Sequence, residues 1–208
     1  MNKEIIIGLT GQTGSGKSTV SEYLSQNGLA GIDCDIVARK VTEDSSPCCK
    51  ELAKLFPSCF DNDLHLDRKA LGNIVFNDKS KLRLLNDTIF PYINAEIASE
   101  IELRKAEGYK YIVLDAPTLF EAGADKLCDI IISCIADEET RIFRITQRDG
   151  ISRQQAAARI SSQRSAKEYA QSSDIVVCNN GSITALLHAA DYIIYLIKEN
   201  KYVINKKA

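Results

Sequence analysis

The sequence has no hydrophobic run that could cross a membrane and no recognisable leader segment. Its apolar stretches all fall short of the roughly 20 residues that a membrane-spanning helix needs. The first residues, Met1 to Glu4, lead into only three consecutive isoleucines before Gly8, too few for the apolar part of a signal peptide. We therefore expect a soluble, cytoplasmic protein with no membrane partner.

The sequence also lacks the patterns of a metal-binding or disulfide framework. Its seven cysteines include no Cys-x-x-Cys pair, and its only histidines, His65 and His188, lie far apart in the chain. Cys128, Cys134 and Cys178 fall in or beside apolar runs, where a thiol behaves as a small hydrophobic group. We interpret the adjacent Cys48 and Cys49 as reduced.

Excess charge of one sign is missing as well. The 26 Lys and Arg residues nearly balance the 28 Asp and Glu residues, which leaves a formal charge of -2 at pH 7. Such a balance argues against a protein that coats nucleic acid through its overall field, so we expect no nucleic-acid partner, although a local basic patch is compatible with these counts. The 208 residues, 45% of them apolar, suffice for one sizeable core, and we predict a single domain over residues 1–208 with insertions. The sequence does not indicate an oligomeric state.

What the chain does contain is a series of short, continuously apolar segments separated by helical ones. We predict strands near residues 4–9, 29–33, 109–117, 128–136 and 173–180. Strands of this kind are typical of a parallel sheet covered on both faces, the α/β class. Ligands of such sheets gather beyond the carboxyl ends of the strands, which places the glycine-rich turn after the first strand, Asp33, Asp35, Asp115 and Asn179 along one rim.

Helices are expected between these strands. The first should cover residues 17–27 and end at Gly28, a residue suited to a left-handed cap. The last should cover residues 182 to about 201, with apolar side chains, Ile183 among them, spaced to cover the sheet. Between the second and third strands lies a polar, helix-rich insertion over about residues 36–107, too long for an ordinary crossover, in which we predict a break at Pro91.

The turn after the first strand carries the most specific motif. Gly11-Gln12-Thr13-Gly14-Ser15-Gly16-Lys17-Ser18 satisfies G-x-x-x-x-G-K-[ST] and lies between a strand and a helix, as that motif requires. Its glycines let backbone N–H groups surround phosphate oxygens, while the lysine can reach the outer phosphates and the serine hydroxyl can ligate magnesium. The motif therefore predicts a nucleoside triphosphate site that includes Gly14, Ser15, Gly16, Lys17, Ser18 and Thr19.

The reaction is indicated by the segments at the other strand ends. A regulatory GTPase should offer D-x-x-G and N-K-x-D, but the strand ends read "LDAPT" and "VCNNG". Phosphoryl transfer to a hydroxyl needs a nearby carboxylate, and "IDCDIVAR" supplies Asp33 and Asp35, which we expect to divide magnesium-water and base duties. The alternative is that Asp35 only caps the following helix. Arg39 could pair with Asp35 or bind an acceptor phosphate, and the sequence leaves both open.

A run of arginines suggests a mobile element over the triphosphate. Its members recur every three to six residues, and the first three share one helical face: Arg141, Arg144, Arg148, Arg153, Arg159 and Arg164. Guanidinium groups suit phosphate oxygens, so a lid that carries them could stabilise charge on the transferring group. The alternative is a solvated helix face.

In order, the motifs "GLTGQTGSGKST", "IDCDIVAR", "LDAPTLFEAG", "RITQRDG" and "SDIVVCNNGS" resemble those of the dephospho-coenzyme A kinases over nearly the whole chain. The resemblance implies a three-layer P-loop kinase with a mainly parallel five-stranded sheet, a helical acceptor-binding insertion over about 36–107 and an arginine-rich lid over about 141–171. It also implies ATP-dependent phosphorylation of the ribose 3'-hydroxyl of dephospho-coenzyme A, with ATP as co-substrate and Mg²⁺ as cofactor. The alternatives are a kinase for another small metabolite and an ATP-dependent, nucleic-acid-associated module.

Site roles follow from the same resemblance. The catalytic residues would be Asp35 as general base, Lys17 and Arg144. ATP would also contact Arg148, Asn179 and Gly181. The acceptor would contact Asp33, Asp35, Arg39, Phe90, Asp115 and Pro117, and magnesium would be held by Ser18 and Asp33. The chain departs from the family's pattern at Phe90, which is usually histidine, and at Tyr169, which is usually lysine or arginine.

Overall fold

A five-stranded sheet organises the chain. The structure is a computed structural model that describes residues 3–202. Its strands are β1 (Ile5–Gly11), β2 (Ala30–Asp33), β3 (Tyr111–Asp115), β4 (Ile130–Ile135) and β5 (Ile175–Cys178), and they pair in the order β2-β3-β1-β4-β5. Every pairing in this sheet is parallel, with Leu9 opposite Asp115 on one side and Ile132 on the other. The predicted α/β class with a mainly parallel five-stranded sheet is confirmed.

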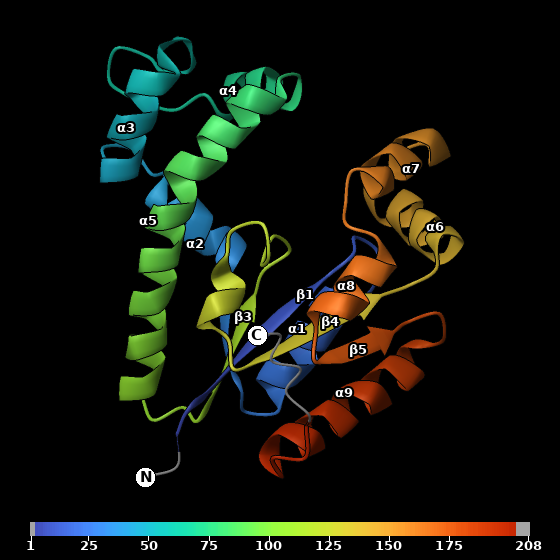
Figure 1. The fold of residues 1–208 in the computed structure, drawn as a ribbon. Helices are drawn as coiled ribbons and strands as arrows, with labels where there is room; N and C mark the ends of the chain where they lie inside the picture. The colour runs from blue at the N-terminus through green and yellow to red at the C-terminus, as the bar shows by residue number, and fades with distance from the viewer. Residues whose placement is uncertain (1–2, 203–208) are drawn as a thin grey trace.

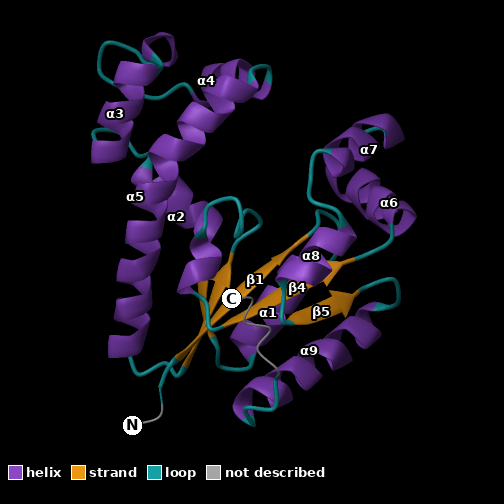
Figure 2. Cartoon of the chain, in the orientation of Figure 1, coloured by secondary structure: helices purple, strands orange, loops and turns teal. Residues whose placement is uncertain are grey.

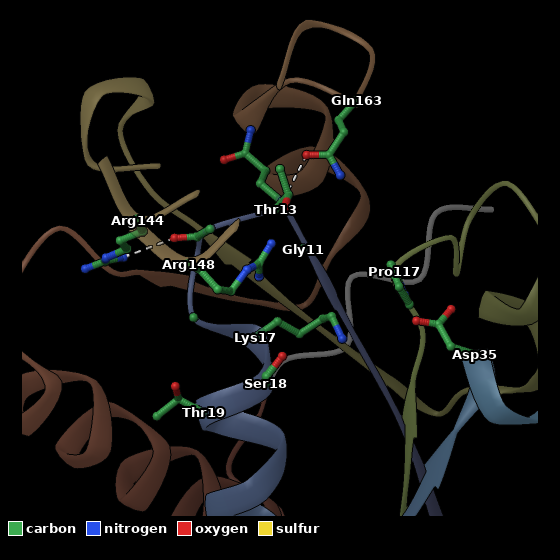
Figure 3. Close-up of a pocket in the computed structure, with 13 residues that line it drawn as sticks. Gly11, Thr13, Lys17, Ser18, Thr19, Asp35, Pro117, Arg144, Arg148 and Gln163 are labelled. Atoms are coloured by element: carbon green, nitrogen blue, oxygen red, sulfur yellow. Dashed lines mark hydrogen bonds between the residues drawn. The ribbon is translucent and has the colours of Figure 1, made fainter. Parts of the chain in front are cut away.

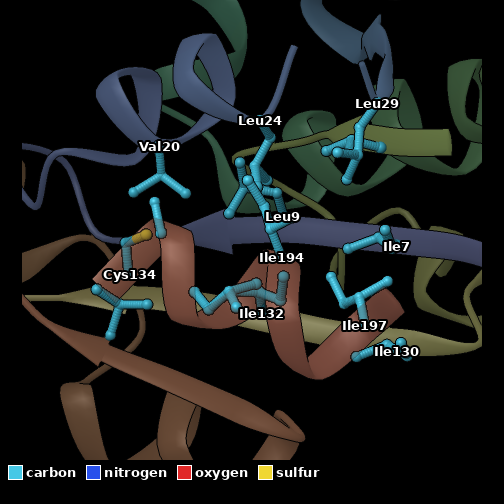
Figure 4. Close-up of a cluster of buried hydrophobic side chains, with 14 of the residues drawn as sticks. Ile7, Leu9, Val20, Leu24, Leu29, Ile130, Ile132, Cys134, Ile194 and Ile197 are labelled. Carbon is cyan, nitrogen blue, oxygen red and sulfur yellow. The ribbon is translucent and has the colours of Figure 1, made fainter. Parts of the chain in front are cut away.

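Helices cover both faces of the sheet (Figures 1 and 2), and β1 is therefore buried at every position. Side chains of a strand alternate between faces: Ile7 packs beneath α1 (Lys17–Gln26) and α9 (Ile183–Lys198), in the cluster that Figure 4 shows around Leu24 and Ile197. Ile6 instead packs against α2 (Cys34–Val41) and α5 (Lys79–Ala106) on the opposite face. The result is a three-layer sandwich in which the carboxyl ends of all five strands form one edge.

The helices that flank the sheet begin and end close to the predicted positions. The first ends at Gln26 and is followed by Gly28 with a φ of 86°, as its glycine indicated. The last begins after Ser182, whose hydroxyl accepts a hydrogen bond from the Ala185 N–H, and it ends at Lys198. The prediction that Ile183 covers the sheet is wrong, because this first-turn side chain is 65% exposed.

The insertion between β2 and β3 contains α2, α3 (Pro47–Leu55), a 3-10 turn (Pro57–Cys59), α4 (Arg68–Phe76) and α5. Its outer part has an apolar cluster of its own, with Leu52, Leu71 and Val75 at the centre. The predicted break at Pro91 is wrong, since α5 runs through this residue without interruption. Pro91 is exposed, while its neighbours Ile89 and Phe90 are packed into apolar clusters. Burial at about 1.5 to 3 kcal/mol per large apolar side chain offsets the roughly 3 kcal/mol that an interior proline costs a helix.

The arginine-rich segment forms α6 (Glu138–Asp149), α7 (Arg153–Ser161) and α8 (Ala166–Ser172) after β4. The first two pack on each other through a small cluster of their own, Ile142, Ile145, Ala156 and Ile160. Helix α8 lies against β4 and β5 instead. A four-residue 3-10 turn (Ala124–Leu127) lies between β3 and β4. Within residues 3–202 no helix is both long and apolar enough to span a membrane.

Candidate active site

The glycine-rich loop joins the end of β1 to the start of α1, and its conformation depends on glycine. Gly11 has a φ of 151°, and a Cβ there would lie 2.3 Å from the Cys134 carbonyl oxygen. Gly16 has a φ of 92°, and a Cβ there would lie 2.5 Å from Asn179 Nδ2. Larger residues at these two positions would collide with backbone or with a buried side chain. Only glycine therefore lets the chain curl tightly and present its N–H groups at the helix start.

A cleft of about 510 Å³ opens over this loop (Figure 3). It lies at the carboxyl edge of the sheet, and its walls come from the loop, α1, α2, the segment after β3 and the arginine-rich helices. Of the predicted site residues, it brings together Gly14, Gly16, Lys17, Ser18, Thr19, Asp35, Pro117, Arg144 and Arg148. The other predicted residues, Ser15, Asp33, Arg39, Phe90, Asp115, Asn179 and Gly181, do not line it.

Lys17 forms an ion pair with Asp115, and both side chains are only 16% exposed. Figure 3 shows Lys17 extended across the cleft toward Pro117 and Asp35. Asp115 ends β3, which lies beside β1, and its backbone is in register with Asp33 at the end of β2. The carboxylate of Asp115 is therefore held next to the lysine of the loop motif.

The two aspartates of the "IDCD" segment have separate structural positions. Asp33 is the residue that caps α2: its Oδ1 accepts hydrogen bonds from the N–H groups of Asp35, at 2.8 Å, and Ile36, at 3.1 Å. The alternative that Asp35 caps this helix is wrong, because Asp35 already lies in its first turn. The carboxylate of Asp35 instead faces the cleft. Partial desolvation, followed by the negative charge of Asp33, raises the pKa of Asp35 above its ordinary value.

Arg39 lies one helical turn beyond Asp35. Among the described residues no ion pair joins the two, so the first of the two roles considered for Arg39 is not present in this structure. Arg39 lines a second hollow, between the helices of the insertion.

Arg144 binds backbone and side-chain oxygens of the glycine-rich loop and of the segment after β5. Its guanidinium donates to the carbonyl oxygens of Gly14, at 3.3 Å, of Asn179, at 2.9 Å, and of Gly181, at 3.4 Å. The buried Asn179 side chain in turn donates from Nδ2 to the Ser15 carbonyl oxygen at 2.8 Å. Asn179 and Gly181, predicted to contact ATP, thus form with Arg144 a brace between the phosphate loop and the segment after β5.

The other arginines of the run differ sharply in environment. Arg141 is 3% exposed, and its guanidinium donates to the Thr13 carbonyl oxygen at 2.9 Å and to Gln163 Oε1 at 3.1 Å. Gln163 Oε1 also accepts from the Thr13 N–H at 2.9 Å. Arg141 and Gln163 therefore hold the loop at Thr13. Gln163 also lines the cleft, a position for which the sequence offered no signal. Arg148 borders the cleft and pairs with Asp149.

The two departures from the family's pattern lie in packed surroundings. Phe90 lines a small hollow together with Asp35 and packs against the core beneath α2 and α5. Tyr169 is 2% exposed, and the centre of its ring lies 6.1 Å from the centre of the Phe120 ring. The Arg164 guanidinium stacks over the Phe120 ring at 4.4 Å. Tyr169 therefore fills the fold under the arginine-rich helices and does not line the cleft.

A phosphate loop at the carboxyl edge of a parallel sheet, facing a carboxylate across one cleft, defines a P-loop kinase. The family model described as dephospho-CoA kinase matches residues 5–185, and the chain belongs to this family. A dephospho-CoA kinase from Fusobacterium nucleatum is 40% identical over 182 residues, which cover 88% of this chain and 93% of that protein. One from Arabidopsis thaliana is 38% identical over 182 residues, covering 87% of this chain and 78% of that protein.

Solved structures agree with this family. The crystal structure of TT1252 from Thermus thermophilus, with 31% identity, superposes with a TM-score of 0.80 and covers 93% of this chain and 98% of that one. A dephospho-CoA kinase from Campylobacter jejuni, with 28% identity, has a TM-score of 0.71 and covers 94% and 98% of the two chains. A shikimate kinase from Acinetobacter baumannii, 15% identical with a TM-score of 0.54 over 95% of both chains, shares the fold.

Proposed function

We propose that this protein transfers the γ-phosphoryl group of ATP to the ribose 3'-hydroxyl of dephospho-coenzyme A, with Asp35 as the base. Membership of the dephospho-CoA kinase family supports the substrates and the reaction. The observation that carries the proposed role of Asp35 is that its carboxylate opens onto the same cleft as the phosphate loop, Lys17 and Ser18. Donor phosphate and acceptor hydroxyl would therefore meet between α1 and α2.

In the proposed step the acceptor oxygen attacks the γ-phosphorus in line with the bridging oxygen of the leaving ADP. A bond forms between the ribose 3'-oxygen and phosphorus, the bond from phosphorus to the bridging oxygen breaks, and the hydroxyl proton passes to Asp35. The raised pKa of Asp35 makes its carboxylate a stronger base than an ordinary aspartate. No covalent phospho-enzyme is required.

Positive groups of the chain would balance the charge that spreads over the transferring group. Lys17 lies at the centre of the cleft, and Arg144 and Arg148 border it from α6. Lys17 would leave Asp115 to reach the outer phosphates, and one or more of the Arg144 N–H groups would turn from carbonyl to phosphate oxygens. Because these donors act in a partly enclosed site, their effect on the transition state is larger than in water.

The oxygen donors around the loop fit Mg²⁺, which prefers carboxylate, hydroxyl and water oxygens. The Ser18 hydroxyl lies at the cleft, as the motif predicts, and would be one ligand. Of the carboxylates, Asp115 is better placed than Asp33, because it already contacts the Lys17 ammonium while Asp33 Oδ1 accepts two helix N–H groups. When bound there, the ion would neutralise charge on the phosphates.

The experiment that tests the reaction is mass spectrometry of dephospho-coenzyme A after incubation with the protein and Mg-ATP. We expect one added phosphoryl group, located on the ribose 3'-oxygen by fragmentation, together with one equivalent of ADP. A parallel panel of nucleoside, nucleotide and sugar acid acceptors tests the alternative of another small-metabolite kinase. Phosphorylation of one of these, with dephospho-coenzyme A left unmodified, would contradict the proposal.

A further inference from the structure

We infer that Gln163 is a further phosphate-binding residue, and that its side-chain amide passes the positive charge of the buried Arg141 on to the triphosphate. The inference deepens the proposed function, because it adds a contact to the nucleotide site on which that function rests. Gln163 lies between α7 and α8 and lines the cleft together with the glycine-rich loop. In Figure 3 its amide is on the opposite side of the cleft from α1, which carries Lys17 and Ser18. A triphosphate held at the start of α1 would therefore face this amide.

The orientation of the Gln163 amide is fixed by its neighbours. Its Oε1 accepts hydrogen bonds from the Thr13 N–H, at 2.9 Å, and from the Arg141 guanidinium, at 3.1 Å. Both of these groups can only donate, so the amide oxygen must be on their side and the nitrogen on the other. Among residues 3–202 this nitrogen forms no hydrogen bond. Gln163 thus presents a donor group at the wall of the cleft.

Arg141 supplies a positive charge that has no acidic partner in the described part of the chain. Its side chain is buried, and it takes part in none of the ion pairs there. Desolvation lowers the pKa of Arg141 more than Tyr169 and Glu138 raise it, but a guanidinium group stays charged in proteins. A buried charge of this kind is costly. A triphosphate at the neighbouring loop would offset that cost.

Two amides lie between this charge and the cleft. The first is the Gln163 side chain. The second is the peptide that joins Thr13 to Gly14, because Arg141 Nε also donates to the Thr13 carbonyl oxygen, at 2.9 Å. This peptide is trans, so the N–H of Gly14, a residue that lines the cleft, points away from that oxygen.

A hydrogen bond from a cation to the oxygen of an amide polarises the amide and strengthens its N–H groups as donors. The Gln163 amide and the Thr13–Gly14 peptide both accept such a bond from Arg141. Arg141 can therefore attract phosphate oxygens without touching them, which makes it a positioning residue, whereas Gln163 contacts the nucleotide itself.

The segment that carries Gln163 is held in place by its next residue. The Arg164 carbonyl oxygen accepts a hydrogen bond from the buried Gln12 side chain, at 3.5 Å. The Arg164 guanidinium stacks over the Phe120 ring at 4.4 Å and donates to Ser172 Oγ at 3.1 Å. A donor that is fixed before the ligand arrives loses little side-chain freedom on binding, and this favours affinity.

The first test separates a phosphate contact from mere support of the loop. Gln163→Glu keeps an oxygen for Thr13 and Arg141, and its charge strengthens the second of these bonds. It also replaces the amide donor with a negative group at the wall of the cleft. We expect the affinity for Mg-ATP, measured by calorimetric titration without an acceptor, to fall about tenfold or more. The thermal unfolding midpoint should not fall.

Gln155→Glu is the matched control for this variant. It makes the same substitution at an exposed position of α7. Gln155 Oε1 accepts a hydrogen bond from the Ser152 N–H at 2.9 Å, and a glutamate forms the same bond. The affinity of Gln155→Glu for Mg-ATP should stay within about twofold of the original.

A third variant, Gln163→Met, removes the oxygen and the nitrogen together at similar volume. It should bind Mg-ATP more weakly than the original protein but more tightly than Gln163→Glu, since it adds no repulsion. If Gln163 only supported the loop, this order would be reversed, because only methionine breaks the bonds to Thr13 and Arg141. The reversed order, or an equal loss in Gln155→Glu, would overturn the inference. An unchanged affinity in Gln163→Met would also overturn it, whether or not Gln163→Glu folds.

The second test concerns the charge behind the two amides. Arg141→Gln keeps a polar side chain but removes the charge, and we expect the affinity for Mg-ATP to fall about tenfold. Lys167→Gln, which removes the same charge from an exposed position of α8, should change it by less than about twofold. Equal losses in these two variants, or an unchanged affinity in Arg141→Gln, would show that the buried charge does not act on the triphosphate.

The combination of Arg141→Gln with Gln163→Met tests whether the charge acts through the amide. The combined loss of affinity should be smaller than the product of the two single losses, because part of the effect of Arg141 passes through Gln163. Independent effects would contradict this. All of these measurements need no acceptor. If the protein phosphorylated a compound other than dephospho-coenzyme A, the proposed function would fail while the variants would still decide the role of Gln163.

Discussion

At the scale of single residues, the decisive arrangement is the division of work between two aspartates two positions apart. Asp33 caps α2 and Asp35 faces the cleft. We expect Asp35→Asn to lower kcat by about 10²- to 10⁴-fold, because the amide cannot accept the hydroxyl proton. ATP affinity should stay nearly the same, since the phosphates are held by the loop. Turnover assays combined with ATP titration check both expectations.

The matched control is Asp33→Asn, since asparagine caps a helix about as well as aspartate and the fold should be kept.

The variant Asp33→Asn also leads to a prediction about the pH dependence of the reaction. The base must be deprotonated to act, so the raised pKa of Asp35 moves the acidic limb of kcat/KM to higher pH. Removing the negative charge of Asp33 lowers that pKa, and the limb should shift to lower pH. A limb that stays in place would show that another group controls it, and unchanged turnover in Asp35→Asn would remove Asp35 from the role of base.

Arg144 gives a second prediction at this scale. Arg144→Ala removes the donors of the brace that joins the loop to Asn179 and those proposed to reach the transferring group. We expect kcat to fall by about 10- to 100-fold and ATP affinity to fall by less. The control is Arg153→Ala, which removes an exposed arginine that pairs with the exposed Glu139 of the same segment. A loss of ATP affinity with unchanged kcat would limit Arg144 to nucleotide binding.

The sequence predicted which residues border the cleft better than it predicted what each one touches. Lys17, Ser18 and Asp35 follow from spacing, because the loop motif and the strand ends fix where the backbone leaves the sheet, and Arg148 follows from the arginine run. Sequence spacing could not distinguish Arg141, buried behind the loop, from the other members of its helical face. That difference depends on how α6 sits against the loop, and this in turn depends on contacts between residues more than 100 positions apart.

At the scale of secondary-structure elements, α5 shows how tertiary packing overrides a local signal. Proline normally ends or kinks a helix, but α5 continues for 28 residues because both of its halves are anchored in apolar clusters. The periodicity predicted the helix, whereas its continuity depended on the clusters that a single sequence does not reveal.

The proline inside α5 leads to a prediction about the stability of the protein. Pro91→Ala should raise the free energy of unfolding by about 2 kcal/mol. The increase comes from a restored helix hydrogen bond at an exposed position, and it is reduced by the entropy that proline removes from the unfolded chain. Ser99→Ala, at another exposed position of α5, should change it by no more than about 0.5 kcal/mol. Urea unfolding curves measure both. A decrease in Pro91→Ala would mean that the packing of Phe90 requires the proline's geometry.

At the scale of the whole molecule, stability is distributed unevenly. The cluster between the sheet, α1 and α9 contains sixteen buried residues, whereas α6 and α7 share only four. We expect the amide hydrogens of α7 to exchange faster than those of α1 in the nucleotide-free protein. Nucleotide bound to Arg144 and Arg148 should slow the exchange of α7 through α6. Hydrogen exchange followed by mass spectrometry tests this, and equal protection of the two helices would contradict a separately mobile lid.

The general architecture was the most predictable part of the protein. Continuous apolar strands separated by helices require a parallel sheet covered on both faces, and the loop motif fixes its functional edge. The hollows of the insertion were less predictable, because α2, α3, α4 and α5 contribute their walls from segments whose relative placement depends on the apolar cluster around Leu52 and Val75.

The ion pair between Lys17 and Asp115 has a consequence for how the donor substrate enters. In the proposed reaction Lys17 moves from Asp115 to the phosphates, which would leave an uncompensated carboxylate close to a polyanion. A bare nucleotide would meet this repulsion in full, whereas one that arrives with a divalent cation brings a replacement partner for Asp115. The resting contact would thus act as a filter inside the cleft, favouring the metal complex of ATP over the free nucleotide before any chemistry takes place.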